Sequence, residues 1–265
     1  MNSNEYRKQW LRFHKRYERD AFRIFQSNLR RTANQIPFSL LNENNYKELI
    51  GIAVNDIEVR NAYLNVYREI GIKHGVKVGK GINRDLKFFT LELFESTFTR
   101  GLLEWIINNT GTRITSVKDT LVKYLIKIIA DGFEEGRTIQ EIARIMQRTI
   151  NSRSFYRWQA LRIARTETTA AANYAATIAG DSSVYVMEKV WISAQDNRVR
   201  RRPEDKYDHV DMHNITVDPG TTFNVQGDKL RFPGDPKGKP SNVIQCRCTV
   251  AITPKRDKNG DLIFK

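Results

Sequence analysis

The sequence lacks any apolar run long enough to cross a bilayer. Its longest apolar stretches, such as residues 125–130, fall far short of the roughly 18 to 20 residues that a membrane-spanning helix requires. The N-terminal residues also lack the apolar core and the small-residue cleavage site of a secretory signal. We therefore predict no membrane span and no membrane partner.

Cysteine is scarce, because Cys246 and Cys248 are the only two in 265 residues. This count argues against a disulfide framework and in favour of free thiols or metal ligands. Neither a Ser/His/Asp pattern nor a nucleophile elbow is present. Four glycines between residues 71 and 81 fit no phosphate-binding motif, and they predict breaks or flexible loops.

Positive charge, by contrast, is abundant. The chain carries 44 Lys and Arg against 30 Asp and Glu, a net charge of +14, which indicates a polyanionic partner. Two segments hold the excess: residues 1–31 contain 9 basic and 3 acidic side chains, and residues 137–202 contain 12 and 5. Such clustering is typical of a binding surface, although a pair of solvated helix faces would also show it.

The first basic segment coincides with an expected amphipathic helix over residues 4–35. Apolar residues step by three and four from Tyr6 to Ile24, and basic side chains lie beside this aromatic stripe. A core-facing stripe, a membrane-surface helix and a ribonucleoprotein module all share the pattern. We predict DNA contacts from both basic segments, through Arg12, Lys15, Arg16, Arg19, Arg23, Arg198, Arg200, Arg201 and Arg202.

Helical periodicity continues to about residue 179 and then gives way to strands. Further helices are expected over residues 86–109, 116–130 and 154–179, and a capping box predicts a helix start at Thr138. Small residues in the second half of the last helix predict that it is buried. Short strands are expected over residues 184–192, 221–225, 230–232 and 243–252.

The order of these elements predicts an α+β fold. A long helical N-terminal portion precedes a small strand-rich C-terminal domain that packs on a helix. We predict three parts: a basic amphipathic helix (1–36), a helical domain (37–136) and an α+β domain (137–265).

A zinc site is one reading of the C-terminal histidines and cysteines. His209 and His213 precede Cys246 and Cys248 in the same strand-rich region, and zinc binds such ligands. Residues two apart in a strand lie about 6.6 Å apart, so a shared ion requires the thiols to lean together or the strand to bend. Structural thiols with surface histidines, and a strained disulfide, are the alternatives.

Asp196 directly precedes a dense basic run, from Arg198 to Arg202. An acid in such a place more often supports arginines through ion pairs than it catalyses a reaction. With His209 and His213 it also defines an alternative function, a metal-dependent nuclease in which a metal polarises a phosphate and a histidine activates water. No nuclease motif is complete, and catalysis is not expected.

An ordered set of residues in the second half of the chain resembles a known family. The set comprises Arg165-Thr166-Glu167, Asn173, Trp191, Asp196-x-Arg198-x-Arg200, His209, Phe223, residues 231–236 and Gln245-Cys246-Arg247-Cys248. In this order, over about residues 137–252, it resembles the phage Mu F-like minor head proteins. The Arg-Thr-Glu helix and the Pro-Gly-Asp loop that leads into Cys-Arg-Cys are its best markers.

The resemblance implies a bacteriophage head-morphogenesis protein at the portal vertex, of a kind often able to bind DNA. The protein would lie in the virion, inside the capsid or at the portal vertex, after assembly in the host cytoplasm. Its implied partners are the portal protein, double-stranded DNA and a major capsid or scaffolding protein. The resemblance also implies a structural role for the Arg-Thr-Glu motif and for Trp191.

Metal positions follow from the same resemblance. It implies that Asp196, His209, Cys246 and Cys248 occupy the polar positions at which a metal is suspected in the family. Zinc as the expected ion, and His213 as a further candidate ligand, come from the spacing of the histidines and cysteines. The chain departs from the family pattern at residue 245, where Asn is usual and Gln stands here. It also has Asn214 where Gly is common, and an insertion over residues 201–208. We predict a non-enzymatic head protein that binds duplex DNA without reading its sequence.

Overall fold

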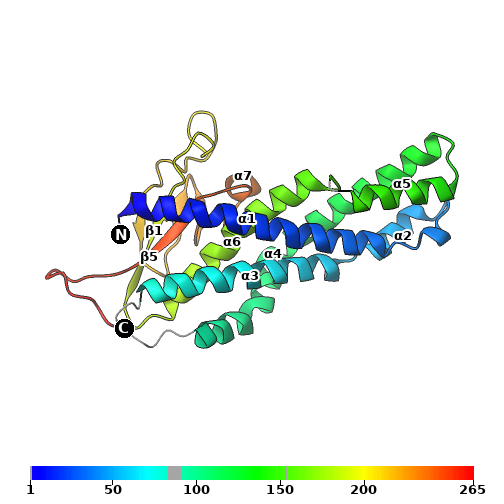
Figure 1. Cartoon of the computed structure of the whole chain (residues 1–265). Helices are drawn as coiled ribbons and strands as arrows, with labels where there is room; N and C mark the ends of the chain where they lie inside the picture. Colours follow the sequence, from blue (N-terminus) through cyan, green and yellow to red (C-terminus); the bar gives the residue numbers. More distant parts are fainter. Residues whose placement is uncertain (1, 83–90, 153) are drawn as a thin grey trace.

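The structure, a computed structural model, describes residues 2–82, 91–152 and 154–265. Long helices that lie side by side make up most of the molecule, and short strands gather at one end (Figure 1). The long helices are α1 (Ser3–Asn34), α3 (Asp56–Ile82), α4 (Leu91–Glu134) and α6 (Arg157–Asp181). The shorter ones are η1 (Phe38–Leu40), α2 (Tyr46–Ala53), α5 (Ile139–Asn151) and α7 (Pro240–Val243).

The strands form two small antiparallel sheets. In the three-stranded sheet, β1 (Met187–Ile192) lies between β2 (Thr216–Val217) and β5 (Thr249–Pro254). Strands β1 and β5 pair along their whole length, from Met187 opposite Pro254 to Ile192 opposite Thr249. The hairpin consists of β3 (Phe223–Val225) and β4 (Asp228–Leu230). This order, helices first and strands last, confirms the predicted α+β fold.

Helix α1 confirms the amphipathic helix predicted over residues 4–35. Asn2 caps its start, because the side-chain Oδ1 accepts a hydrogen bond from the backbone N of Glu5 at 2.9 Å. Trp10, Tyr17 and Ala21 of the apolar stripe are buried, and α1 packs against α3 and α6. The stripe therefore faces the core, and the basic flank is left in solvent.

The prediction that glycines break the chain between residues 71 and 81 is wrong, because these residues lie inside α3. Two of them serve close helix packing. A Cβ atom on Gly71 would collide with the ring of Phe98, and one on Gly75 would collide with the ring of Phe94. Glycine thus lets two rings of α4 pack against the backbone of α3, and burial of those rings outweighs the low helix propensity.

A single helix, α4, stands where two were predicted, over residues 86–109 and 116–130; residues 86–90 lie outside the described residues. The implied interruption around Gly111 is wrong. Ile106 and Ile114 are buried on either side of it, and the Thr110 hydroxyl donates to the Ile106 carbonyl at 2.6 Å. Burial of the flanking residues outweighs the roughly 1 kcal/mol that a glycine costs in a helix.

The capping box and the buried small-residue helix are both confirmed. The Thr138 side chain accepts from the Glu141 backbone N while the Glu141 carboxylate accepts from the Thr138 backbone N, and α5 follows. Helix α6 begins and ends a few residues later than predicted, and its residues from Thr166 to Ala176 are all buried.

Two of the four predicted strands correspond to β1 and β3, whereas β4 shares only Leu230 with the strand predicted over residues 230–232. The strand predicted over residues 243–252 is wrong in its first half. Residues 244–248 follow α7 as irregular chain, and β5 begins only at Thr249. The Cys-x-Cys sequence therefore lies before the strand and not within it.

One hydrophobic core extends through the molecule, from Trp10 of α1 to Ile252 of β5. Helix α6 joins the two ends, because it packs against α1, α3 and β5. The division into three domains stays a prediction. In the described part of the chain, no helix combines the length and the apolar character that a membrane span requires.

Candidate functional site

Helix α6 holds the cysteine-bearing segment, residues 245–250, through polar side chains on one face. The Thr166 hydroxyl accepts from the backbone N of Gln245 at 3.0 Å, and the Thr169 hydroxyl donates to the carbonyl of Cys246 at 2.5 Å. One turn further on, the Asn173 Oδ1 accepts from the backbone N of Val250 at 3.0 Å. Buried backbone N–H and C=O groups need hydrogen-bond partners. In this segment, side chains of α6 supply the partners that a neighbouring strand would supply in a sheet.

The Asn173 amide also binds the loop that contains the Pro-Gly-Asp sequence. Its Nδ2 donates to the carbonyl of Pro233 at 2.8 Å and to that of Cys248 at 3.2 Å. Gly234, in this loop, has φ +79°, and a Cβ there would press on Thr169 of α6. The two best markers of the family resemblance thus meet on one helix, where glycine allows the loop to approach the backbone.

Arg165, the first residue of the Arg-Thr-Glu motif, joins three segments. Its guanidinium forms two hydrogen bonds with the Glu18 carboxylate of α1, at 2.7 and 3.1 Å. It also donates to the Gln245 Oε1 at 3.0 Å. A bidentate arginine–carboxylate pair fixes direction as well as distance, so Arg165 holds α1 and the cysteine segment in register with α6.

Glu167, the last residue of the motif, points into the helical bundle. Its carboxylate accepts from Arg113 of α4 at 3.1 Å and from the Tyr67 hydroxyl of α3 at 2.9 Å. Only 2 % of the Glu167 side chain is exposed. Two buried charges that satisfy each other in this way tie α3, α4 and α6 together.

The two cysteine thiols converge because the chain bends before the strand. Gln245 has φ +60°, in the left-handed region, and the backbone N of Cys246 donates back to the carbonyl of Val243 at 3.2 Å. Both cysteines are buried, whereas Arg247 between them is only half-buried. The bend therefore brings the two thiols close together, which a regular strand would not do. Both thiols are free.

His209 lies against both thiols and its ring orientation is determined by two neighbours. The Asn242 Nδ2 donates to the Asp228 carboxylate at 2.8 Å, so the Asn242 Oδ1 faces the His209 Nε2, at 2.6 Å. The Asp228 carboxylate can only accept, so it must bind the NH₂ group of Asn242. The Asn242 Oδ1 that is left facing His209 can also only accept, so the His209 Nε2 must carry the proton. The lone pair of its Nδ1 then points toward the cysteines.

The three donor atoms form a compact, enclosed cluster. The His209 Nδ1 lies 3.6 Å from the Sγ of Cys246 and 3.6 Å from the Sγ of Cys248, and all three donor atoms lie within 4.8 Å of one another. Trp191, which is fully buried, packs edge-on against the His209 ring with centroids 5.3 Å apart. A hydrogen bond from the Cys248 thiol lowers the pKa of Cys246, whereas burial raises the pKa of Cys248.

Asp196 and His213, which the sequence also offered as ligands, lie outside this cluster. Both carboxylate oxygens of Asp196 accept hydrogen bonds from Arg247, and this bonding lowers the pKa of the carboxyl. The His213 Nδ1 accepts from the backbone N of Ser193 at 3.2 Å. Asp196 thus supports an arginine, and His213 supports the end of β1.

The predicted DNA-contacting residues of α1 are all exposed. No ion pair engages them within the described part of the chain. The same holds for Arg198, Arg201 and Arg202 after β1, but the Arg201 side chain donates to a backbone carbonyl and is left out of the set. We call this set the basic surface; its members are Arg12, Lys15, Arg16, Arg19, Arg23, Arg198 and Arg202.

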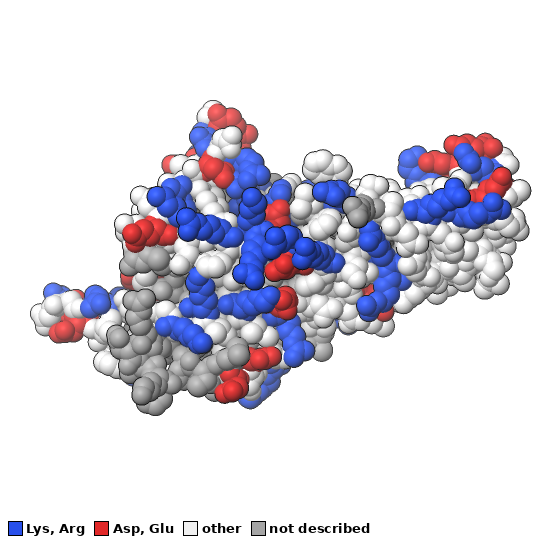
Figure 2. Space-filling model, viewed as in Figure 1, with Lys and Arg blue, Asp and Glu red and all other residues white. Residues whose placement is uncertain are grey.

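The fold brings the two basic segments to one face. Arg7 of α1 donates to the carbonyl of Ala194 at 3.3 Å, and the Trp10 Nε1 donates to the carbonyl of Arg247 at 2.8 Å. Lys and Arg outnumber Asp and Glu across this face (Figure 2). Arg200 and Arg201 are engaged elsewhere, the first with Asp205 and the Ile244 carbonyl and the second with the Asp196 carbonyl.

Sequence reasoning missed Asn242, Asp228 and Arg113. Each acts on a residue at least fourteen positions away, so no local spacing marks it. One signal was available: Pro240 fits the first turn of a helix, and it would have predicted α7 where a strand was expected.

Fold and site together define an α+β protein with a buried cysteine–histidine cluster beside helix α6 and a surface rich in Lys and Arg. Residues 124–251 match the model of one family, described as Phage Mu protein F like protein. The match confirms the predicted resemblance, and it indicates a phage head-morphogenesis protein of the virion. The comparisons with curated proteins and with solved structures found no match.

Proposed function

We propose that the protein is a minor head protein that binds double-stranded DNA through the basic surface, without reading its sequence. The observation that supports this most directly is the set of seven exposed cations without ion pairs within the described part of the chain. Neighbouring arginines such as Arg165 and Arg247 are neutralised by carboxylates. The cations of the basic surface are thus available to phosphates.

Binding of this kind depends steeply on salt. Each phosphate contact releases counterions, so a patch with six to ten contacts loses roughly 10³ to 10⁵ in affinity between 50 and 200 mM salt. No base-reading element is required, because contacts to the phosphate backbone carry no sequence information directly.

A pair of double variants tests the DNA proposal. Arg12→Gln/Arg16→Gln removes two cations of the basic surface, and Arg144→Gln/Arg148→Gln removes two exposed cations of α5. Gel retardation of duplex DNA across salt concentrations should show the logarithmic salt slope reduced by about 2 for the first variant and unchanged for the second. No retardation by the parent protein at 50 mM salt would refute DNA binding.

We further propose that the protein acts at the portal vertex, through contact with the portal protein and with a major capsid or scaffolding protein as a further partner. The family match supports this location. Co-expression with the portal protein of the same phage, followed by affinity purification, should recover both chains. Recovery of this protein alone would contradict the portal contact and would leave the DNA proposal standing.

We also propose that His209, Cys246 and Cys248 hold a zinc ion. The donor set fits, because thiolate and imidazole are the ligands that zinc prefers and the lone pair of the His209 Nδ1 already faces both thiols. Asn242 and Asp228 would orient the histidine from behind. The ion would link the 209 loop to the cysteine segment and so stabilise the strand-rich end.

Metal analysis and thermal unfolding test the zinc proposal. Protein purified without chelators should contain about one zinc per chain, and Cys246→Ser should lose the ion and lower the melting temperature. Arg198→Gln, an exposed change in the same region, should alter neither. Absence of metal from the parent protein would favour plain thiols.

The burial of the His209, Cys246 and Cys248 side chains argues against the alternative function, a metal-dependent nuclease. Plasmid DNA incubated with the protein and Mg²⁺, Mn²⁺ or Zn²⁺ should therefore stay supercoiled.

A further inference from the structure

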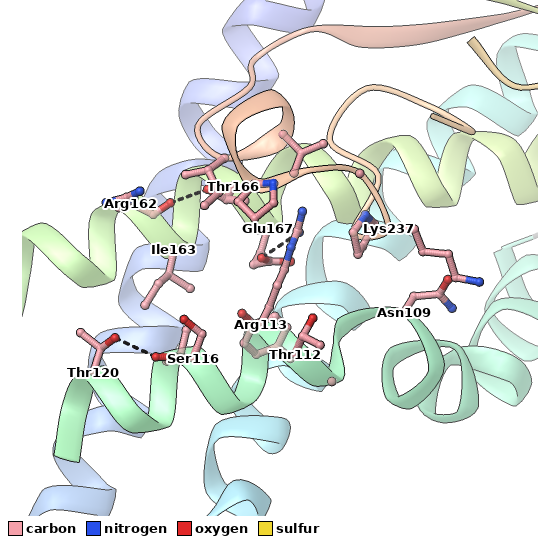
Figure 3. A pocket seen from close by; sticks show the side chains of 18 of the residues that line it. Asn109, Thr112, Arg113, Ser116, Thr120, Arg162, Ile163, Thr166, Glu167 and Lys237 are labelled. Atoms are coloured by element: carbon pink, nitrogen blue, oxygen red, sulfur yellow. Dashed lines mark hydrogen bonds and ion pairs between the residues drawn. The ribbon is translucent and has the colours of Figure 1, made fainter. Parts of the chain in front are cut away.

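A cavity of about 940 Å³ lies between α4, α6 and the loop that precedes α7 (Figure 3). Its volume falls in the range of known ligand-binding sites. No residue of the basic surface or of the histidine–cysteine cluster lines it. We call it the α4–α6 cleft, and it has no part in the function proposed above.

The length of the cleft indicates an extended ligand. Helix α4 lines it from Ile107 to Thr120, and thirteen helical rises of about 1.5 Å give about 20 Å. An extended peptide of about six residues covers that distance, at about 3.3 to 3.6 Å per residue. A single inorganic ion would leave most of the cleft empty.

The charge of the lining indicates an acidic ligand. Three cations, Arg113, Arg162 and Lys237, line the cleft, and the one carboxylate among the lining residues, Glu167, already accepts from Arg113. The Nη2 of Arg113 is buried and has no hydrogen-bond partner within the described part of the chain. Thr112 and Ser116 of α4 lie across the cleft from α6 (Figure 3), whereas the Thr120 hydroxyl donates to the Ser116 carbonyl of its own helix.

Exposed apolar residues of the cleft lining and of the adjoining face of α6 favour a protein ligand. Ile107 lines the cleft and is 46 % exposed. Trp158 is 80 % exposed and precedes Arg162 by one helical turn, so the two share a face of α6. Tryptophan and arginine are the residues that most often dominate protein interfaces. Single-stranded nucleic acid needs a series of exposed aromatic side chains for successive bases, and Trp158 alone does not supply one, because the tyrosines of the lining, Tyr63 and Tyr156, are buried.

We propose that the α4–α6 cleft binds an extended acidic segment of a partner protein, about six residues long. Its carboxylates would pair with Arg162 and Lys237 at the edge and approach Arg113 within. Its apolar side chains would pack on Ile107 and on Ile163 of the lining.

Selection from a random dodecapeptide library displayed on bacteria tests the proposal on the full chain. Enriched peptides should share an acidic residue with aliphatic neighbours. Fluorescence anisotropy with a synthetic copy should show binding about five- to tenfold weaker for Arg162→Glu and for Lys237→Glu. Both residues are exposed, so both variants should fold, which circular dichroism checks. Arg144→Glu, an equal charge change on α5, should bind as the parent does.

Three outcomes would overturn the proposal. The first is a library that yields no peptide binding the parent protein. The second is a selected peptide that binds Arg162→Glu and the cleft-filling variant Thr112→Trp as tightly as the parent. The third is a twelve-nucleotide single strand that competes for the cleft with the same sensitivity to these variants. Duplex DNA retardation by the same variants should match the parent, so failure of the cleft proposal is distinguishable from failure of the DNA proposal.

Discussion

Asn173 shows how single polar side chains organise the strand-rich end. It is fully buried in a helix of small residues, and its amide forms hydrogen bonds with Pro233, Cys248 and Val250. Both the oxygen and the nitrogen of the side chain are therefore satisfied by backbone groups. One residue thus connects the Pro-Gly-Asp loop, the cysteine segment and the first residues of β5.

Two departures from the family pattern fall at positions of left-handed backbone. Asn214 has φ +66° where the family commonly has Gly, and Gln245 has φ +60° where it usually has Asn. Glycine and asparagine tolerate this region best. At residue 245 the Gln side chain accepts from Arg165, and this bond offsets part of the less favourable conformation.

Glu167 yields a prediction at this scale. Removal of one partner from a buried ion pair leaves an uncompensated charge, so Glu167→Ala should lower the free energy of unfolding by about 3 to 5 kcal/mol. The double variant Arg113→Ala/Glu167→Ala should lose less than the sum of the two single losses, because no lone charge remains. Urea unfolding of the four proteins measures the coupling, and additive losses would contradict it.

Among the elements, α3 and α4 show how packing overrides local preference. Glycines spaced four apart in α3 accept the rings of Phe94 and Phe98, and α4 stays helical through Gly111. Propensity disfavours helix at each of these glycines, but a helix in a bundle is stabilised mainly by the apolar face that it buries.

Two glycine-to-alanine substitutions should therefore change the stability of the protein in opposite directions. Gly75→Ala places a Cβ against the Phe94 ring and should cost about 1 to 3 kcal/mol through overpacking. Gly101→Ala, in α4, places its Cβ in open space and should stabilise by about 0.5 to 1 kcal/mol through helix propensity. Melting temperatures of both variants compare them directly, and a stabilised Gly75→Ala would refute the packing role of that glycine.

For the whole molecule, two buried histidines make stability depend on pH. Burial lowers the pKa of His14 to about 3, helped by Arg247, Arg165 and Arg198, and burial with Lys77 lowers the pKa of His74 to about 3. The unfolded chain takes up protons at these groups below a pH of about 6.5, whereas the folded chain does not. The part of the free energy of unfolding that these two neutral histidines provide is therefore fully present above that pH, and it is lost as the pH falls toward 3.

At pH 5 each of these histidines should lower the free energy of unfolding by about 2 kcal/mol relative to pH 7. Within the described residues, neither ring nitrogen of His74 has a hydrogen-bond partner, and the ring packs between Trp10 and Tyr17, so His74→Leu should fold. Urea unfolding at the two pH values should show the loss reduced by about 2 kcal/mol in this variant. An unchanged pH dependence would show that His74 is not the group responsible.

Local sequence patterns predicted a large part of the fold. Periodicity predicted α1 and α6, the Thr138 capping box predicted the start of α5, and the order of elements predicted the α+β class. These features depend on residues within a few positions of one another, which sequence displays directly. The strand predicted over residues 243–252 was half wrong because Pro240 starts a helical turn and Gln245 bends the chain. Pro240 signals the turn, but no sequence pattern marks the bend.

The amino-acid sequence alone determined the helical front, the strand-rich end, the two segments of excess charge and the resemblance to the Mu F-like family. Only the tertiary structure decided which ligand candidates meet, leaving Asp196 with Arg247 and bringing His209 to the two cysteines. It also decided that α1 lies beside the arginines after β1, and that α4 and α6 enclose a cleft. The physical reason is that these arrangements depend on contacts between residues far apart in the chain, which burial in a common core selects and local spacing does not encode.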